Sequence, residues 1–478
     1  MILPEALQLP VFRTLSTCAD RLGLRAYVIG GFVRDFLLDR PCKDIDVVVE
    51  GRGIDLAEEF AKAVNAREVI VYENFGTAMV RHDDFVVEFV GARKESYSRN
   101  SRKPFVEEGS LQDDQLRRDF TVNALSLSLQ PGEFGKLYDP FGGINDLNQG
   151  ILRTPQNADI TFSDDPLRMM RAIRFATQLP GFSIDPDTYE AIRRNKERIN
   201  ILSMERVADE LNKIILAPVP SIGFNLLFES GLLPYILPEL QAMHGVDEVD
   251  GRAHKDNFYH TLKVLDNVAE VSNDLWLRWV AILHDIAKPL TKRYSPEAGW
   301  TFHGHEERGA KLVPKIFRRL KLPLHEQMKY VQKLVRLHQR PIALVSEEVS
   351  DSAIRRIVVE SDGSLDDLLL FCRCDITSKN ERKVARFLRN YDELQDRIRA
   401  VAERDDLRNF QPPVTGEMIM EAFGLSPGRA IGQIKNEIRE AILDGIIPNE
   451  LEAAKVFMME VGPKYLGAPD HKNSKKES

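Results

Sequence analysis

The sequence predicts an α+β fold, in which a head of strands and helices precedes a long helical body. Three observations predict it. Short apolar runs alternate with helical segments over the first 150 residues. Helical periodicity begins near Ile151 and continues from there. The composition is that of a globular protein, with 43% hydrophobic and 29% charged residues, and 478 residues suffice for about three domains.

The head is predicted from short β-type runs bounded by turn residues. The strands are expected at 26–30, 44–50, 66–72, 76–81 and 85–90. The spacing of Val33, Leu37 and Leu38 predicts a helix directly after the first strand, and the triplet His82-Asp83-Asp84 predicts a hairpin turn. The helices of the body are expected at 164–176, 187–198, 204–215, 257–271, 274–287 and 307–320.

Charge and cysteine content limit the possible partners and location. The net charge of −8 argues against a nucleic-acid partner when it is taken over the whole chain. The chain has only four cysteines (Cys18, Cys42, Cys372 and Cys374), which favours reduced thiols over a disulfide framework. The N-terminus does not have the pattern of a secretory signal, and no apolar run is long enough to span a membrane. We therefore expect a cytoplasmic protein with no membrane partner.

The first chemical signal is a pair of carboxylates on the second predicted strand. Side chains alternate along a strand, so Asp44 and Asp46 point to the same face. Carboxylate oxygens in this arrangement suit Mg²⁺, and Glu88 on a later strand is the candidate third ligand. Gly30 and Gly31 precede a helix, where bare backbone N–H groups can approach a triphosphate. By itself, an Asp-x-Asp pair is more often solvated surface.

The ordered set Gly-Gly-x-Val-Arg-Asp, followed nine residues after Asp35 by Asp-x-Asp, is much more specific. It resembles the nucleotidyltransferase head of the polymerase-β-like superfamily. In particular, it resembles the class II tRNA nucleotidyltransferases, or CCA-adding enzymes, and the related bacterial poly(A) polymerases. Further matches follow in the family's order at 117–124, 139–143, 164–175 and 203–206. The resemblance implies a nucleotide site made of Gly30, Gly31, Arg34, Arg117, Asp119, Asn123, Asp164, Asp165, Arg168, Arg171 and Arg174.

Two residues of this set predict selection of C and A. Asp165 and Arg168 are three apart in a predicted helix and so share a face. Cytosine and adenine each present an amine beside a ring-nitrogen acceptor, which a carboxylate and a guanidinium match. Uracil and guanine present the opposite pattern, and each unpaired buried group costs about 1–3 kcal/mol. The alternative is an ordinary salt bridge between the two. The family's usual glutamate at position 164 is an aspartate here.

The resemblance implies template-independent addition of C, C and A to the 3′ end of tRNA from CTP and ATP. The 3′-hydroxyl would attack the α-phosphate in line, and pyrophosphate would leave, with two Mg²⁺ ions at Asp44 and Asp46. Poly(A) synthesis remains an alternative, but residues 69–93 do not contain the basic Phe–His segment of the bacterial poly(A) polymerases. The polar segment 95–109 suits the flexible loop of full CCA enzymes. Addition of only CC or only A is a smaller possibility.

A second constellation lies in the body. His260, His284-Asp285 and Asp375 each stand at the polar edge of an apolar segment predicted to be helical. Their order resembles the HD superfamily of metal-dependent phosphohydrolases. The resemblance implies that these four residues hold Ni²⁺, Mn²⁺ or another divalent metal. Additional substrate or second-metal contacts are expected from His303, His305 and His338. The alternatives are a phosphohydrolase whose head only binds nucleotide, and a helical body that only holds RNA.

Basic residues concentrate between Arg308 and Arg340, where ten Lys and Arg accompany one acidic residue for a local charge of +9. We expect this stretch to follow tRNA phosphates, with Arg318, Arg319 and Lys321 as the candidate contacts. The resemblance also implies a division into four parts. These are a nucleotidyltransferase head at 1–150, an elongated helical neck at 151–245, an HD body at 246–400 and a helical tail at 401–478.

Overall fold

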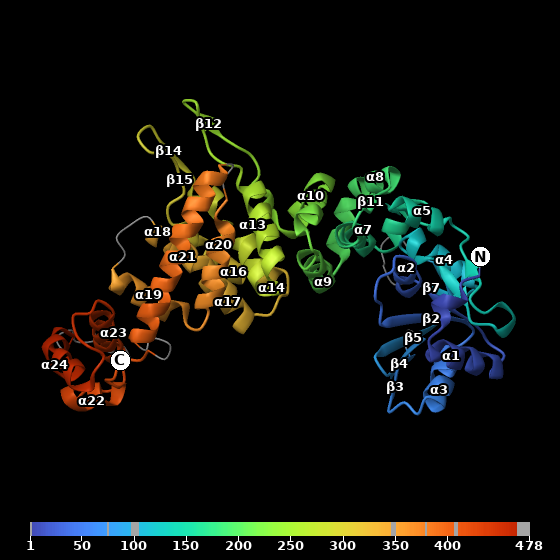
Figure 1. Ribbon diagram of the computed structural model, residues 1–478, viewed down its shortest axis with the longest axis horizontal. Coiled ribbons are helices and arrows are strands. Elements are labelled where there is room, and N and C mark those ends of the chain that lie inside the picture. The colour runs from blue at the N-terminus through green and yellow to red at the C-terminus, as the bar shows by residue number, and fades with distance from the viewer. Residues whose placement is uncertain are drawn as a thin grey trace, which may run out of the picture. The chain divides into compact units, whose positions relative to one another are not determined.

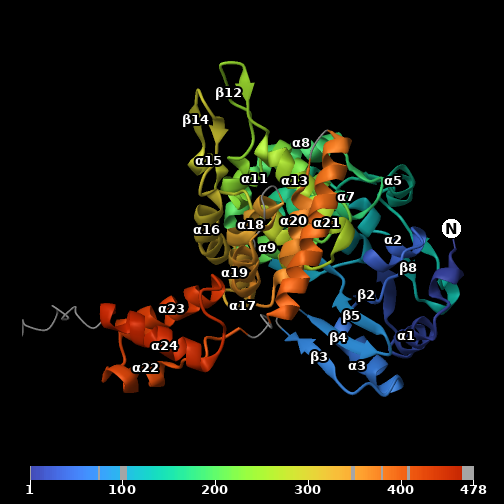
Figure 2. The same cartoon turned by 60° about the vertical axis from the view of Figure 1, so that its left-hand side comes forward.

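A computed structural model describes residues 2–73, 76–96, 105–345, 350–377, 380–405 and 410–465 (Figures 1 and 2). The chain forms two compact units. The first comprises Met1–His244, Ala269–Leu275 and Ile316–Leu322. The second comprises Gly245–Val268, Trp276–Lys315 and Pro323–Ser478. No helix in the described ranges is long and apolar enough to cross a membrane.

The head contains a mixed seven-stranded sheet of order β3-β4-β5-β2-β1-β8-β9, drawn mainly in blue in Figure 1. Among the described strands of this sheet, β2 and β5 pair in parallel and the other neighbours pair antiparallel. The strands are β1 (Arg25–Ile29), β2 (Asp44–Glu50), β3 (Val69–Tyr72), β4 (Thr77–His82), β5 (Phe85–Gly91), β8 (Ser126–Ser128) and β9 (Leu137–Tyr138). The predicted α+β head and its first five strands are confirmed.

The alternation of β2 explains how the sheet presents its acids. Ile45, Val47 and Val49 point into the main core, where helices α1 (Pro10–Arg21) and α3 (Gly53–Ala63) cover the sheet. Burial of each such side chain contributes about 1.5–3 kcal/mol, which fixes the register of the strand. Asp44 and Asp46 alternate with these residues and therefore lie on the opposite face.

The rest of the first unit is mainly helical, and α7 packs against α9 and α10. Besides α1 and α3, its helices are α2 (Gly31–Leu37), α4 (Leu111–Leu116), α5 (Gly143–Gln149), α6 (Ala158–Asp164), α7 (Leu167–Gln178), α8 (Pro186–Asn195), α9 (Met204–Ile215), α10 (Pro220–Ser230), α11 (Leu233–Ile236) and α12 (Pro238–Gln241). A short parallel pair joins β10 (Ile151–Leu152) to β11 (Ser183–Ile184).

The predicted helix 164–176 is wrong as a single element. Helix α6 ends at Asp164 and α7 begins at Leu167. Asp165, with φ −136° and ψ 100°, is extended between them. The cause is Pro166, whose ring disfavours helical geometry in the residue before it.

The second unit contains the helical body and the C-terminal helices, which are drawn in red in Figure 1. Its helices are α13 (Asn257–Val271), α14 (Leu275–Leu283), α15 (Lys288–Thr291), α16 (His305–Arg319), α17 (Glu326–Leu337), α18 (Gln339–Leu344), α19 (Asp351–Ser361), α20 (Leu365–Asp375), α21 (Glu381–Arg404), α22 (Gly416–Phe423), α23 (Arg429–Leu443) and α24 (Leu451–Val461). The hairpins β12–β13 (Glu248–Val249, Arg252–Ala253) and β14–β15 (Arg293–Ser295, Gly299–Thr301) lie side by side (Figure 2).

Two further expectations need correction. The predicted helix 274–287 ends at Leu283, so His284 and Asp285 stand in a turn rather than on a helix. The ends of the predicted loop 95–109 pair as the strands β6 (Arg93–Ser96) and β7 (Phe105–Glu108). The middle of that loop, 97–104, lies outside the described residues.

Candidate functional site

The three predicted head carboxylates come together on one face of the sheet. Asp46 pairs directly with Glu88 across the parallel strands β2 and β5, and Asp44 lies two residues earlier on β2. Burial raises the pKa of Asp46, and the positive charge of Arg118 partly opposes this increase. Burial and the charge of Asp46 likewise raise the pKa of Glu88. These acids are therefore costly to ionise together, and a bound cation would relieve that cost.

Gly30 leaves open the space beside these carboxylates. Its φ is +81°, and a Cβ there would lie 2.8 Å from Nη1 of Arg118 and 3.2 Å from Oδ2 of Asp46. Gly31 follows as the first residue of α2. The predicted open backbone at Gly30 and Gly31 is thus present. The space beside it is bounded by Asp46 and by Arg118, which was not among the residues predicted from the sequence.

Arg118, rather than the predicted Arg117, faces the carboxylates. The buried Asp114 pairs with both arginines, and its Oδ2 lies 3.2 Å from Nε of Arg118. Nη1 of Arg118 is the atom nearest to the Cβ position of Gly30. The sequence prediction named Arg117 of these two adjacent arginines, and the fold shows that Arg118 also lies at the site.

A buried chain of hydrogen bonds connects four predicted nucleotide-site residues. Arg34 Nη1 donates to Asn123 Oδ1 at 2.7 Å, and Asn123 Nδ2 donates to Asp119 Oδ1 at 3.0 Å. Arg171 Nε donates to Asp119 Oδ2 at 2.7 Å. Burial alone would raise the pKa of Asp119, but Arg171 and Asn123 hold it well below its usual range. These hydrogen bonds therefore keep Asp119 ionised and hold the side chains of Arg34 and Arg171 in place.

Three arginines surround the ring of Phe175. The guanidinium carbons of Arg174, Arg34 and Arg171 lie 4.2, 4.9 and 5.4 Å from the ring centroid. Arg174 Nε also lies 3.1 Å from the buried Glu210, and burial lowers the pKa of Arg174 to about 10. Phe175 thus orients three cations by cation–π contact, an arrangement that suits a polyanion such as a triphosphate.

The alternative interpretation of Asp165 and Arg168 was an ion pair between them. The contacts of the described residues do not include that pair. Asp165 pairs with Arg206 at 3.3 Å and accepts a hydrogen bond from the Leu167 N–H. Arg168 donates to the carbonyls of Arg117 at 2.5 Å and Thr161 at 3.3 Å. The expectation that both share one helix face is wrong, because Asp165 precedes α7. The preceding residue, Asp164, ends α6.

The four predicted residues of the body also come together. His260 projects from α13, His284 and Asp285 from the turn after α14, and Asp375 from the end of α20. His260 Nε2 lies 3.1 Å from Asp375 Oδ1, and His284 Nε2 lies 3.2 Å from Asp285 Oδ2. Lys288 Nζ lies 2.5 Å from the same Oδ2 atom.

The ionisation of this cluster suits metal binding. Burial lowers the pKa of His260, which keeps its imidazole neutral. Burial also works against a charge on His284, yet Asp285 and Asp375 raise its pKa. Asp285 and Asp375 both have lowered pKa values despite their burial, because the histidines beside them favour the carboxylates. Imidazoles and carboxylates in one buried cluster form a ligand set for a divalent transition metal.

Two of the three additional histidines join the cluster. His305 and His338 are buried, with Nε2 atoms 3.1 and 3.8 Å from Asp285 Oδ1. His303 is exposed and lines a separate cavity with Arg293 and Arg308.

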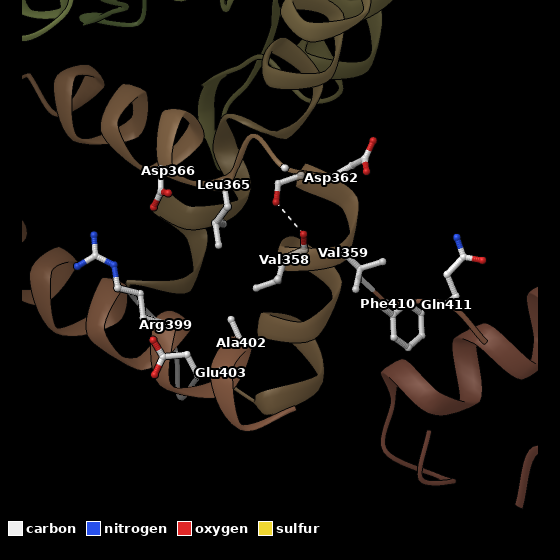
Figure 3. A pocket seen from close by; sticks show the side chains of 12 residues that line it. Val358, Val359, Asp362, Leu365, Asp366, Arg399, Ala402, Glu403, Phe410 and Gln411 are labelled. Atoms are coloured by element: carbon white, nitrogen blue, oxygen red, sulfur yellow. Dashed lines mark hydrogen bonds between the residues drawn. The ribbon is translucent and has the colours of Figure 1, made fainter. Parts of the chain in front are cut away.

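Cavities flank the cluster. A 260 Å³ cavity is lined by ligand residues together with Lys288 and Gln339. A 690 Å³ cavity, which His260 also lines, includes Lys255, Tyr259 and Thr377 in its wall. A further cavity of 680 Å³ is lined by residues of α19, α21 and Phe410 (Figure 3). None of the described residues lining that last cavity belongs to a predicted site.

The three predicted RNA contacts differ in their surroundings. Arg318 and Lys321 are exposed. Arg319 instead donates from both terminal nitrogens to Glu239 at 2.6 Å, which ties the end of α16 to α12. Only the first two are therefore available to a phosphate without breaking an ion pair.

Carboxylates on paired strands, an open glycine and converging arginines define a nucleotidyltransferase head, and the buried histidine–aspartate cluster defines an HD domain. Family models agree with both. Residues 26–153 match the poly(A) polymerase head domain, 181–243 match a probable RNA- and SrmB-binding site of polymerase A, and 257–362 match the HD domain.

Relatives with known names place the chain more narrowly. It is 34% identical to the A-adding tRNA nucleotidyltransferase of Deinococcus radiodurans over 72% of this chain and 78% of that protein. It is 30% identical to the multifunctional CCA protein of Xanthomonas campestris pv. campestris over 86% of this chain and 99% of that protein. The chain therefore belongs to the tRNA nucleotidyltransferase family.

Solved structures share the fold. The Bacillus stearothermophilus CCA-adding enzyme in complex with CTP has a TM-score of 0.65 at 23% identity, covering 96% of this chain and 99% of that one. The Thermotoga maritima CCA-adding enzyme complexed with tRNA has a TM-score of 0.59 at 21% identity, covering 96% and 99%.

Proposed function

We propose that this chain is a CCA-adding tRNA nucleotidyltransferase, which adds C, C and A from CTP and ATP to the 3′ end of tRNA. The observation that carries the proposal is the register of the head sheet. It sets Asp46 against Glu88, with Asp44 on the same face and Gly30 open beside them. The 3′-hydroxyl attacks the α-phosphate, and pyrophosphate leaves. We also propose that the protein acts in the cytoplasm, where its proposed substrates are present.

The head residues divide the work of binding. Asp44, Asp46 and Glu88 would hold two Mg²⁺ ions, which would supply positive charge to the triphosphate and to the entering and leaving oxygens. Gly30 and Gly31 let the phosphates approach the backbone where α2 begins. Further positive charge for the triphosphate would come from a group of arginines, namely Arg34, Arg117, Arg118, Arg171 and Arg174. Asp119 and Asn123 hold Arg34 and Arg171 in place.

Base selection falls to Asp165 and Arg168. The carboxylate of Asp165 accepts from the amine of C or A, and Arg206 orients it by the ion pair at 3.3 Å. Arg168 uses two N–H groups on backbone carbonyls, and a guanidinium has five, so donors remain for a ring nitrogen. Asp164 is the last residue of α6 and directly precedes Asp165.

Two neighbouring activities compete with CCA addition. The A-adding relative from Deinococcus radiodurans makes addition of A alone a real alternative. Poly(A) synthesis is the other. The Xanthomonas CCA protein, matched over nearly its whole length, favours the complete C, C, A product.

An Asp46→Ala variant tests the role of the head. We expect loss of CTP and ATP incorporation by on the order of 10³-fold or more. Asp84→Ala is a matched control, because Asp84 is exposed in the β4–β5 turn. Full activity of Asp46→Ala would refute the catalytic assignment.

The buried histidine–aspartate cluster favours a second function, a metal-dependent phosphohydrolase in the HD body. His260, His284, Asp285 and Asp375 would hold Ni²⁺, Mn²⁺ or another divalent metal, which would supply Lewis acidity and an activated water. The cavities beside His260 provide room for a phosphate ester, and Lys255 and Lys288 provide cations for it. Hydrolysis of a 2′,3′-cyclic nucleotide with added Ni²⁺ or Mn²⁺ by the wild type, and its loss in Asp285→Ala, tests this function.

For tRNA, we propose phosphate contacts by Arg318 and Lys321, which are exposed, whereas Arg319 serves the fold through Glu239. We also propose the four-part division into head (1–150), neck (151–245), HD body (246–400) and tail (401–478).

A further inference from the structure

A basic cavity in the second unit takes no part in the proposed activities. It has a volume of 270 Å³ and lies where α15, the β14–β15 hairpin and the start of α16 meet (Figure 2). Its wall contains Arg293, His303 and Arg308. We propose that this cavity binds a small phosphate anion, either free or as the terminal phosphate of a nucleotide. The proposal does not depend on a metal in the HD body, because the described residues of this wall include none of the histidine–aspartate cluster.

The walls of the cavity are joined by direct contacts. Arg308 Nη1 donates to the carbonyl of Leu290 at 2.8 Å, which ties α16 to the end of α15. The buried Thr291 places its Oγ1 3.4 Å from the carbonyl oxygen of Phe302, which ties α15 to the segment after β15. These contacts hold the wall in place before a ligand arrives, so little ordering is needed on binding.

Two guanidinium groups supply the charge of the cavity. Within the described ranges, neither Arg293 nor Arg308 forms an ion pair, so neither charge is neutralised. Arg308 uses one N–H on Leu290 and keeps four others, and a second guanidinium adds five. Glu306 and Glu307, the acids of the first turn of α16, are not among the lining residues. Guanidinium forks of this kind bind two phosphate oxygens at once, which favours phosphate over a singly charged anion.

The remaining wall adds donors and limits the size of the ligand. His303 is exposed, and an imidazole carries at least one N–H. Gly304, with a φ of +75°, has open space at its Cβ position, so a ligand can approach the backbone there. A volume of 270 Å³ is below the range of about 300–1,000 Å³ usual for small-molecule sites. The cavity therefore suits one phosphate group, and the sugar and base of a nucleotide would extend out of it.

Equilibrium dialysis of the full chain against [³²P]orthophosphate tests the proposal. EDTA is present at constant ionic strength, so that bound metal does not contribute. Arg293→Ala/Arg308→Ala should lose one bound phosphate per chain, because removal of each guanidinium weakens this site about tenfold. Lys311→Ala/Lys315→Ala is the matched control. It removes the same charge from exposed positions of α16 outside the cavity, and it should bind phosphate as the wild type does.

A second variant covers the case in which loss of the Arg308–Leu290 contact disturbs the fold. His303→Glu changes an exposed residue, leaves the contacts between the walls intact and adds a negative charge to the wall. It should also lose one bound phosphate, at an unchanged unfolding temperature.

The outcomes are distinct. Wild-type phosphate binding by Arg293→Ala/Arg308→Ala or by His303→Glu would overturn the proposal. An equal loss in the lysine control would overturn it as well, because it would indicate diffuse attraction to positive charge. Unlabelled AMP and pyrophosphate, added as competitors, separate the two sources of phosphate. Displacement by AMP supports the terminal phosphate of a nucleotide, and displacement by pyrophosphate alone supports a free phosphate.

Discussion

At the scale of single residues, the sequence predicted most of the chemistry but not every partner. Asp44, Asp46 and Glu88 could be placed together because strand alternation is regular. Arg118 could not be chosen over Arg117, because the choice depends on which side chain approaches Gly30 in three dimensions. The Asp165–Arg206 pair joins positions 41 residues apart in the chain, a separation that no local pattern reports.

Gly30→Ala tests whether the space beside Asp46 is needed. A Cβ would meet Arg118 and Asp46 directly, and we expect nucleotide incorporation to fall about 10²-fold, as for small misplacements at an active site. Gly23→Ala is a matched control, since Gly23 also has a positive φ, +66°, but open space around its Cβ position. Steady-state incorporation assays measure both. Equal losses in the two variants would mean that backbone strain, not the site, is responsible.

The lowered pKa of Asp119 predicts that the free energy of unfolding falls in acid. Its folded pKa is depressed, so its contribution is present above the unfolded pKa of about 3.9 and is lost as the pH falls through the folded value. Asp119→Asn should cost about 3 kcal/mol at pH 7, because Arg171 loses its buried partner. Thermal unfolding from pH 7 to 2 should show a smaller loss of stability below about pH 4 in the variant. An unchanged pH dependence would contradict this account.

At the scale of elements, periodicity located helices and strands well, but a proline and a turn place two predicted functional segments, Asp165 and His284-Asp285, outside the helices expected for them. Helices α9 and α13 have the predicted bounds. The turn at His284-Asp285 was missed because apolar residues lie on both sides of it, so the helical periodicity does not stop there. The break at Asp165 did have a signal in the sequence, Pro166, which helical periodicity alone does not take into account. In both places the residues expected to act leave the helix.

Helix α16 offers a test of how to separate RNA contacts from structural ion pairs. Arg318→Ala should reduce the salt dependence of tRNA binding by about one phosphate contact, with little change in stability. Arg319→Ala should instead destabilise the first unit by about 1 kcal/mol through loss of the Glu239 pair. Filter binding at several salt concentrations and thermal unfolding distinguish the two. The reverse pattern would contradict the assignment.

At the scale of the whole molecule, net charge was the wrong quantity for excluding RNA. The chain carries −8 in total, yet the stretch from Arg308 to Arg340 carries a local charge of +9. The two compact units place the head carboxylates and the HD cluster in different parts of the chain. Motif order predicted both sites because each depends on a few residues at fixed places in the sequence.

Separate sites predict separable activities. Asp46→Ala should abolish nucleotide addition and leave cyclic-nucleotide hydrolysis unchanged, whereas Asp285→Ala should do the opposite. Loss of both activities in either variant would contradict independent sites, provided that its unfolding temperature is unchanged.

The most direct measurement is the product made on tRNA that lacks its 3′ CCA. The purified chain is given each radiolabelled nucleotide alone and then CTP with ATP, and the tRNA 3′ ends are sequenced. The proposed function predicts two C residues from CTP, a following A when ATP is also present, and no incorporation from UTP or GTP. A product extended only by A, or a long A tail, would contradict CCA addition.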